Sequence, residues 1–212
     1  MKVIYKWNTV ISNHVTVILI GLFMLIFAAC TTTYNPLNEY VEVTPAVVEV
    51  PSPGPVDAIS YAPERIARGK YMVELLNCGS CHTDQALLGK PDKARFLAGS
   101  RVGIAYSNPL KEKFPGVLYP ANLTPDPETG LGKWTDEQIL QILRTGIDPY
   151  GYHTLSVMPW TVYSKLSEED AQAIVAFLRS LPAVKHKVPA NVLPGSKAIE
   201  PFVHFGVYQK SN

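Results

Sequence analysis

The sequence predicts an all-α domain with extended segments on either side of it. Two stretches, 135–146 and 167–182, carry apolar residues at helical spacing, and each begins with a hydroxyl residue of the kind that caps a helix. A third helix is expected to begin near Pro63 and to lead directly into "NCGSCHT" at 77–83. These three observations place one helical domain at residues 62–184.

The charge balance of the chain argues against one class of partner. There are 19 Lys and Arg against 18 Asp and Glu, a formal net charge of +1. Proteins that bind nucleic acid usually present a clustered excess of basic residues. We therefore expect no nucleic-acid partner.

Residues 1–29 read as a signal peptide or a membrane anchor. Lys2 and Lys6 precede an uncharged apolar run, 15–29, that is short of the ~20 residues a membrane-spanning helix needs. "FAAC" at 27–30 resembles the lipobox of bacterial lipoproteins, which predicts lipidation of Cys30. An uncleaved N-terminal anchor is the alternative. On either interpretation the chain is exported and anchored on the periplasmic or outer face of a bacterial membrane.

Residues 30–61 read as a semi-extended linker. They contain no Lys or Arg after Cys30 and are interrupted repeatedly by proline, at positions 36, 45, 51, 53 and 55. The valine-rich part, 41–50, has strand character, but Pro45 argues against a strand there.

The next helix is expected to run from Pro63 through "ERIARGKYMVELLN" into Cys78. Ile66, Val73 and Leu76 share one face, and Gly69 lies between them. A glycine there permits the close approach of a second helix.

Cys78, Cys81 and His82 carry the most specific chemistry of the chain. A structural disulfide would be strained at this spacing, a thioredoxin-like pair follows a strand rather than a helix, and a structural zinc site needs four ligands. In C-x-x-C-H the two thiols add to the vinyl groups of haem and the histidine binds the iron. We therefore predict one covalently attached haem c, with Cys78 and Cys81 as thioether sites and His82 as an axial ligand.

Met158, in the loop "LSVMPWTVY", is the expected second axial ligand. Pro159 helps to fix this loop, whereas Met72 lies on the helix before the motif. A core position is the usual alternative for a methionine, and His153 is the rival ligand nearby.

Residues 83–132 show turn residues and no clear periodicity. So long an irregular stretch within a domain is expected to serve a site, and wrapping the haem edge is such a role. Trp134, Trp160 and Tyr163 are expected either to contact the haem or to be ordinary core aromatics.

The two remaining helices have explicit start and stop signals. The first has Thr135 and Gln138 as a capping box and Gly146 as its stop. The second has Ser167 as cap and Pro182 beyond its end, with an apolar face formed by Ile174, Phe177, Leu178 and Leu181.

The order of these elements, with "CGSCHT", "MPW" and "LSEEDAQAIVAFLRSLP", resembles a class I cytochrome c. More narrowly, "YPANLTPDPETGLGKWTDEQILQILRTG" and its neighbours resemble the haem domains of cytochrome subunits of bacterial membrane-bound alcohol and aldehyde dehydrogenases, over about 64–184. The resemblance implies a class I cytochrome c fold around one haem and the ligands named above. It also implies that Gly69 packs against the last helix near Phe177. Those subunits commonly carry three haem domains, whereas this chain has one motif.

Our first functional hypothesis is a membrane-tethered carrier of single electrons between a dehydrogenase or quinol-oxidising complex and a terminal acceptor such as an oxidase. The alternative is a fixed cytochrome subunit of a larger respiratory or dehydrogenase complex, in which the tail 185–212 is a docking arm rather than a cover over its own domain. A haem enzyme is the third hypothesis, and it requires that Met158 leave the iron open. Except in that third case, we expect no enzymatic activity of the chain itself.

Overall fold

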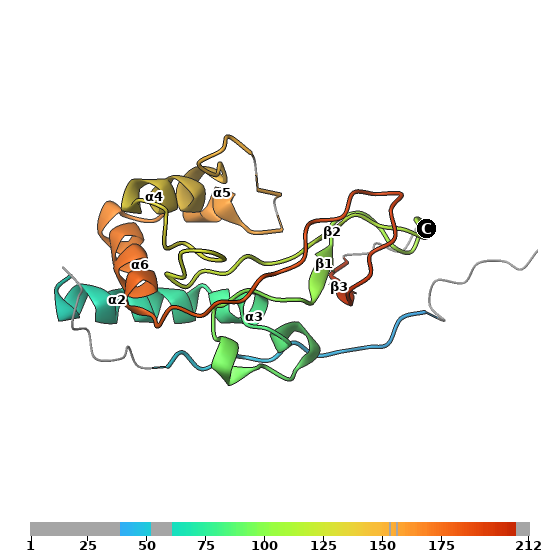
Figure 1. Ribbon diagram of the computed structural model, residues 1–212, viewed down its shortest axis with the longest axis horizontal. Helices are drawn as coiled ribbons and strands as arrows, with labels where there is room; N and C mark the ends of the chain where they lie inside the picture. The colour runs from blue at the N-terminus through green and yellow to red at the C-terminus, as the bar shows by residue number, and fades with distance from the viewer. Residues whose placement is uncertain (1–38, 52–60, 153, 156, 207–212) are drawn as a thin grey trace, which may run out of the picture. The chain divides into compact units, whose positions relative to one another are not determined.

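The computed structural model describes residues 39–51, 61–152, 154–155 and 157–206. The predicted signal segment 1–29, Cys30 and His153 lie outside these residues. The described residues from Val41 onward belong to one compact unit. Its elements, in chain order, are α2 (Pro63–Leu75), α3 (Cys78–His82), the 3-10 helices η2 (Ala86–Leu88) and η3 (Lys93–Arg95), β1 (Gly103–Ala105), β2 (Val117–Leu118), α4 (Asp136–Thr145), α5 (Trp160–Tyr163), α6 (Glu168–Ser180) and β3 (Phe202–His204) (Figure 1).

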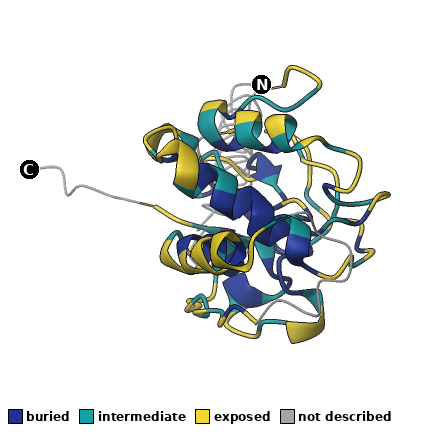
Figure 2. Ribbon diagram, turned by 90° about the vertical axis from the view of Figure 1, so that its left-hand side faces the viewer, coloured by how far each residue is buried: buried dark blue, intermediate teal, exposed yellow. Residues whose placement is uncertain are grey.

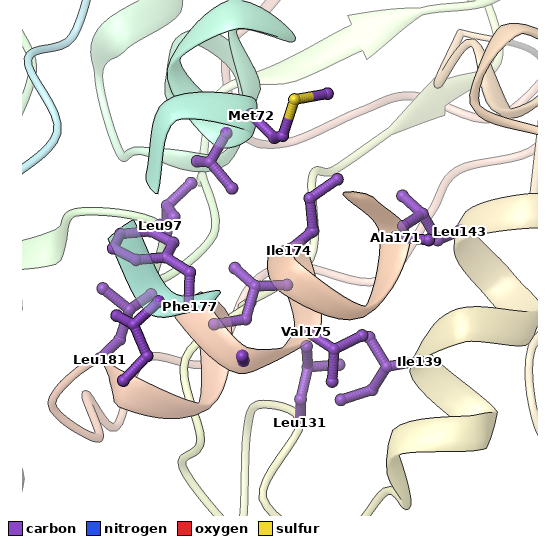
Figure 3. Packing of buried hydrophobic residues seen from close by; sticks show 14 of the residues in the cluster. Met72, Leu97, Leu131, Ile139, Leu143, Ala171, Ile174, Val175, Phe177 and Leu181 are labelled. Atoms are coloured by element: carbon purple, nitrogen blue, oxygen red, sulfur yellow. The ribbon is translucent and has the colours of Figure 1, made fainter. Parts of the chain in front are cut away.

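Helix α6 forms the centre of the core. It makes its most extensive contact with α2 and also packs against α4. Figure 3 shows Ile174, Val175 and Phe177 of α6 among side chains contributed by the neighbouring segments. Most of α6 is buried, whereas α2 and α4 bury one face each (Figure 2). The expected core residues Ile174, Phe177, Leu178 and Leu181 are all buried.

The predicted helix boundaries are confirmed where capping residues mark them. Thr135 accepts a hydrogen bond from the Gln138 amide, and the Gln138 side chain accepts one from the Thr135 amide, which completes the capping box. Gly146 ends α4 with a φ of 69°, a conformation that glycine adopts at little cost. Ser167 accepts a hydrogen bond from the Asp170 amide at the start of α6.

The helix that begins at Pro63 is not continuous into the motif. It ends at Leu75, and Asn77 adopts a left-handed φ of 55° before α3 begins at Cys78. Asparagine is one of the few non-glycine residues that tolerate this conformation, because its side chain can bond locally. The motif therefore forms a short helix of its own.

The core is all-α, as predicted, but the chain also forms a small β-sheet, so the all-α prediction is incomplete. Its strand order is β2-β1-β3, with β1 antiparallel to β2 and parallel to β3. Ile104 pairs with Leu118 on one side and with Val203 on the other. Part of the irregular stretch 83–132 is thus ordered by the C-terminal segment, for which the sequence alone predicts no strand.

Both flanking segments contact the helical domain. Within the described part of the linker, Val50 is buried in the main core and Val48 packs against it. At the other end, Val192 bridges Val117, and Glu200 forms an ion pair with Arg101. None of the helices in the described ranges is long and apolar enough to cross a membrane.

Candidate functional site

Helix α3 brings together the three motif residues. Cys78 and Cys81 are free, half-buried thiols. Cys78 packs against the main core cluster, whereas Cys81 packs against a second cluster formed by Leu87, Val102, Ile104 and Val203. The two thiols are therefore lined by different parts of the chain, and the small sheet contributes to the surroundings of Cys81.

His82 is held by a backbone carbonyl. Its Nδ1 lies 2.8 Å from the oxygen of Ala121, and because a carbonyl can only accept, Nδ1 carries the proton. The lone pair is thereby left on Nε2, which is the arrangement that histidine ligands of metals usually have. Burial lowers the pKa of His82 and so favours the neutral, metal-binding imidazole.

The loop beyond the motif fixes the backbone of His82. The Gly99 amide donates to the His82 carbonyl at 2.8 Å, and Thr83 bridges Gly99. Gly99 has a φ of 84°, and a Cβ there would lie 2.8 Å from the Asn122 nitrogen. Only glycine fits this crossing of the chain, which keeps 99 and 121–122 next to the motif.

The thiols are protonated. Burial raises the pKa of Cys78 to about 12 and also raises the pKa of Cys81. Reactive thiols of disulfide exchange have lowered pKa values, so this environment does not suit a thioredoxin-like pair. Within the described ranges, no three His, Cys, Asp or Glu side chains gather in a further metal site.

Helix α5 lies close to the motif and follows Met158 directly. Tyr163 of α5 is a buried member of the main core cluster against which Cys78 packs, and its burial raises the pKa of its phenol to about 12. Met158 is half-buried and packs against the same core cluster as Cys78 and Tyr163. The methionine loop and the cysteine helix are thus brought to one cluster from distant parts of the sequence.

The methionine loop is anchored at its two ends. The Thr154 amide donates to the Gly146 carbonyl at 2.6 Å, and the Trp160 amide donates to the Met158 carbonyl at 2.8 Å. A Cβ on Gly146 would lie 2.7 Å from the Trp160 ring, so the indole packs directly on the end of α4. Trp160 therefore has a packing role in this structure.

A buried polar cluster ties the chain together just after His82. The Asp84 carboxylate accepts from the Arg95 guanidinium at 2.8 Å and from the Arg101 amide at 2.9 Å. His186 lies beside it, with Nε2 3.7 Å from the Asp84 carboxylate and Nδ1 3.0 Å from the Ala98 carbonyl. Asp84 thus joins the segment 95–101 and the start of the C-terminal segment to the motif.

The donor set fits covalent haem. Two protonated thiols lie one helical turn apart, a neutral imidazole keeps Nε2 for a metal, and a thioether lies on the same cluster as Cys78. Sequence reasoning identified these side chains but missed Ala121 and Gly99. Ala121 contributes a backbone carbonyl and Gly99 a backbone amide, and almost every residue type has both groups. Only the positive φ at Gly99, which favours glycine, gives a signal in the sequence.

Comparison with known proteins gives one family. A family model described as Cytochrome c matches residues 66–182. The chain is 38% identical over 112 residues to the cytochrome c subunit of the quinone alcohol dehydrogenase of Gluconobacter oxydans, covering 53% of this chain and 20% of that protein. It is 34% identical over 141 residues to the fructose dehydrogenase cytochrome subunit of Gluconobacter japonicus, covering 66% and 26%.

The chain is also similar to proteins of two other bacteria. A subunit of the nicotinate dehydrogenase of Pseudomonas putida is 33% identical over 132 residues, covering 62% of this chain and 10% of that protein. A diheme cytochrome c-type protein of Cereibacter sphaeroides is 35% identical over 129 residues, covering 58% and 38%. The chain therefore spans well under half the length of each of these relatives. Three of the four are named as dehydrogenase subunits.

Proposed function

Because this chain belongs to the cytochrome c family, we propose that it is a haem c electron-transfer subunit of a dehydrogenase complex. The observation that carries the proposal is the hydrogen bond from His82 Nδ1 to the Ala121 carbonyl, which leaves Nε2 of a neutral imidazole for iron on the same helix as the two thiols. The family membership of residues 66–182 supports it independently.

The proposed ligands follow from the donor set. Cys78 and Cys81 would hold the haem through thioether bonds, and His82 and Met158 would bind its iron. Haem c, when bound, supplies a one-electron iron couple. The chain contributes a soft thioether at Met158, which favours the ferrous state, and an imidazole at His82 that its surroundings keep neutral. One C-x-x-C-H motif in the sequence supports a single haem.

With His82 and Met158 both bound to the iron, no position would be left there for a substrate. Outer-sphere electron transfer to a neighbouring protein is therefore the activity that we propose, and the chain itself is not the catalytic subunit. The names of the relatives support a dehydrogenase as that neighbour. The mobile, tethered carrier remains our second candidate because the N-terminal sequence suits a lipid anchor.

We also propose that the chain is exported and held on the periplasmic or outer face of a bacterial membrane. The basic start, the apolar run and Cys30 support this part of the proposal. Residues 1–38 lie outside the described structure, so the sequence alone carries it.

The first experiment tests haem attachment and membrane anchoring together. The full chain is produced in a bacterium that matures c-type cytochromes, and haem that survives denaturing electrophoresis is measured for the unmodified chain, for Cys78→Ala and Cys81→Ala, singly and combined, and for Cys30→Ala. We expect covalent haem to be lost when both Cys78 and Cys81 are replaced and to be retained in Cys30→Ala, which instead releases the protein from the membrane. Covalent haem that persists without both motif cysteines would refute the haem site.

Partnership is read from size and activity. The protein is extracted from the native host with a mild detergent and separated by size. If the haem absorbance and a dehydrogenase activity are found in the same fraction, the result supports the hypothesis of a fixed subunit. Haem absorbance that migrates as a single chain, apart from any dehydrogenase activity, supports the mobile carrier instead. Carbon monoxide binding to the reduced protein would point to an open iron and to the haem enzyme.

A further inference from the structure

The linker segment Ala46–Val50, which we call the arm, is docked on the cysteine helix. Its exposure alternates, with Ala46 and Val48 half-buried, Val50 buried, and Val47 and Glu49 exposed. This period of two is that of an extended chain with one face against a surface. The arm lies outside the 66–182 range that the family model matches.

Ala46 makes two backbone contacts with the motif region. Its amide donates to the Ala86 carbonyl in η2 at 2.9 Å, and its carbonyl accepts from Ser80 Oγ at 3.0 Å. Both polar groups of one arm residue are therefore satisfied by the segment that begins at Cys78. Ser80 is only 7% exposed, so its hydroxyl has exchanged water for this contact.

Gly79 and Ser80 are the two residues between the motif cysteines. A Cβ on Gly79 would lie 3.1 Å from the Cβ of Val48, so the arm lies in close contact with the backbone of α3. The Ser80 hydroxyl is also 2.6 Å from Oδ1 of Asn77, the left-handed residue that separates α3 from α2. The arm thus covers the side of α3 that carries Gly79 and Ser80.

The arm continues into the core beside Cys78. Val50 is 6% exposed and belongs to the main core cluster, and Val48 and Cys78 both pack against that cluster. The arm and Cys78 therefore share one core cluster. Val47, only one residue away, is 87% exposed and contributes nothing to this contact.

We propose that the arm is a clasp that positions the haem-binding helix and shields the cysteine side of the haem from water, and so raises its reduction potential. The inference rests on the proposed haem function. Ferric haem carries one more positive charge than ferrous haem, and a surrounding of low polarity disfavours the additional charge. Ser80 and Val48 are positioning residues in this account because they act through α3.

The test compares three substitutions in the haem-loaded full chain. Val48→Asp places a charge in the docked face, Ser80→Ala removes the hydroxyl contact without adding charge, and Val47→Asp adds the same charge on the exposed face. Reduction potentials are measured by redox titration, and release of the arm is followed by limited proteolysis. The red charge-transfer band of methionine-ligated ferric haem is recorded for each protein to show that the axial ligand is unchanged.

We expect Val48→Asp and Ser80→Ala to shift the redox equilibrium toward the ferric form by threefold to tenfold, the upper limit being about 59 mV for a one-electron couple. Val48→Asp should also expose the arm to protease, and Val47→Asp should change neither property. An arm that becomes protease-sensitive without a change in potential would overturn the clasp. If the arm stays protected from protease in Val48→Asp and the reduction potential is unchanged, the clasp proposal is also overturned. The same holds if the potential changes only together with loss of the charge-transfer band, because the axial ligand has then changed. Absence of covalent haem would instead refute the proposed function, so the two failures are distinguishable.

Discussion

Gly69 of α2 and Phe177 of α6 lie in direct contact where the two helices cross. A Cβ on Gly69 would lie 2.7 Å from the Cβ of Phe177 and would overlap the carbonyl oxygen of Ala173. Phe177 is completely buried. The approach of the two backbones therefore depends on the missing side chain, as the family resemblance of the sequence implies.

Gly69→Ala should separate α2 from α6. The added methyl group meets backbone atoms of Ala173, which cannot move aside as the end of a flexible side chain can, and overpacking of this kind costs about 1–3 kcal/mol. Denaturant unfolding of the haem-loaded protein measures the loss. Arg65→Ala on the exposed face of α2 is the control. A Gly69→Ala protein as stable as that control would show that the crossing is looser than described.

The helices could be predicted because their signals are local. Thr135, Gln138 and Gly146 specify the two ends of α4 within a dozen residues. The sheet could not be predicted, because β1 and β3 are three residues each and come from distant parts of the chain. The docking of the arm could not be predicted either, because Pro45 argues against a strand there. The contact requires no strand, only the backbone amide and carbonyl of Ala46.

The haem site likewise has parts that the sequence predicts and parts that it does not. Cys78, Cys81 and His82 are recognisable because covalent haem attachment requires those side chains at that spacing. The partner of His82 is the Ala121 carbonyl, and its position depends on the path of the loop rather than on the residue type. Burial of Ser80 between the cysteines could not be read from the sequence either, because what covers it comes from residue 46.

The contact between Tyr61 and Asp136 should make stability pH-dependent in alkaline solution. The Tyr61 hydroxyl donates to the Asp136 carboxylate, which also accepts from Arg179 at 3.0 Å. Burial, the hydrogen bond to Asp136 and the charge of Asp136 raise the pKa of Tyr61 from 10.0 to about 12. Because the pKa is higher in the folded protein, the contribution is complete below pH 10 and is lost as the pH rises toward 12.

Tyr61→Phe isolates this contribution. We expect the variant to be less stable by about 1–2 kcal/mol at neutral pH, where a hydrogen bond to a charged acceptor is lost. The difference in unfolding free energy between the two proteins should shrink between pH 10 and 12. A difference of zero throughout would mean that Tyr61 contributes through its ring alone, and a non-zero difference that does not shrink over that range would contradict the raised pKa of Tyr61.

Asn122 should be essential to the loop that presents Ala121 to His82. Its amide nitrogen donates to the Val184 carbonyl at 2.8 Å and to the Thr129 hydroxyl at 3.0 Å, and its oxygen accepts from the Thr124 amide at 2.9 Å. Asn122 is 2% exposed, so Asn122→Ala leaves buried groups without partners and should cost about 2–4 kcal/mol.

The control for Asn122 is a second asparagine that bonds to the backbone. Asn191→Ala removes a single bond, to the Tyr119 amide, at an exposed residue and should cost about 1 kcal/mol. Thermal unfolding of both variants gives the comparison, and equal losses would contradict the role of Asn122.

Met158 and Met72 provide a matched pair for the axial ligand. Both pack on the main core cluster, Met72 as a buried residue of α2 and Met158 as a half-buried residue of the loop before α5. Leucine keeps most of the volume of either side chain but has no sulfur to bind iron. Met158→Leu should therefore abolish the red charge-transfer band of the ferric protein. It should also shift the redox equilibrium toward the ferric form by more than tenfold, which for a one-electron couple is more than about 59 mV. Met72→Leu should leave both unchanged. A band that survives Met158→Leu would transfer the role of ligand to another methionine, whereas a ferric protein that lacks the band before any substitution would favour His153.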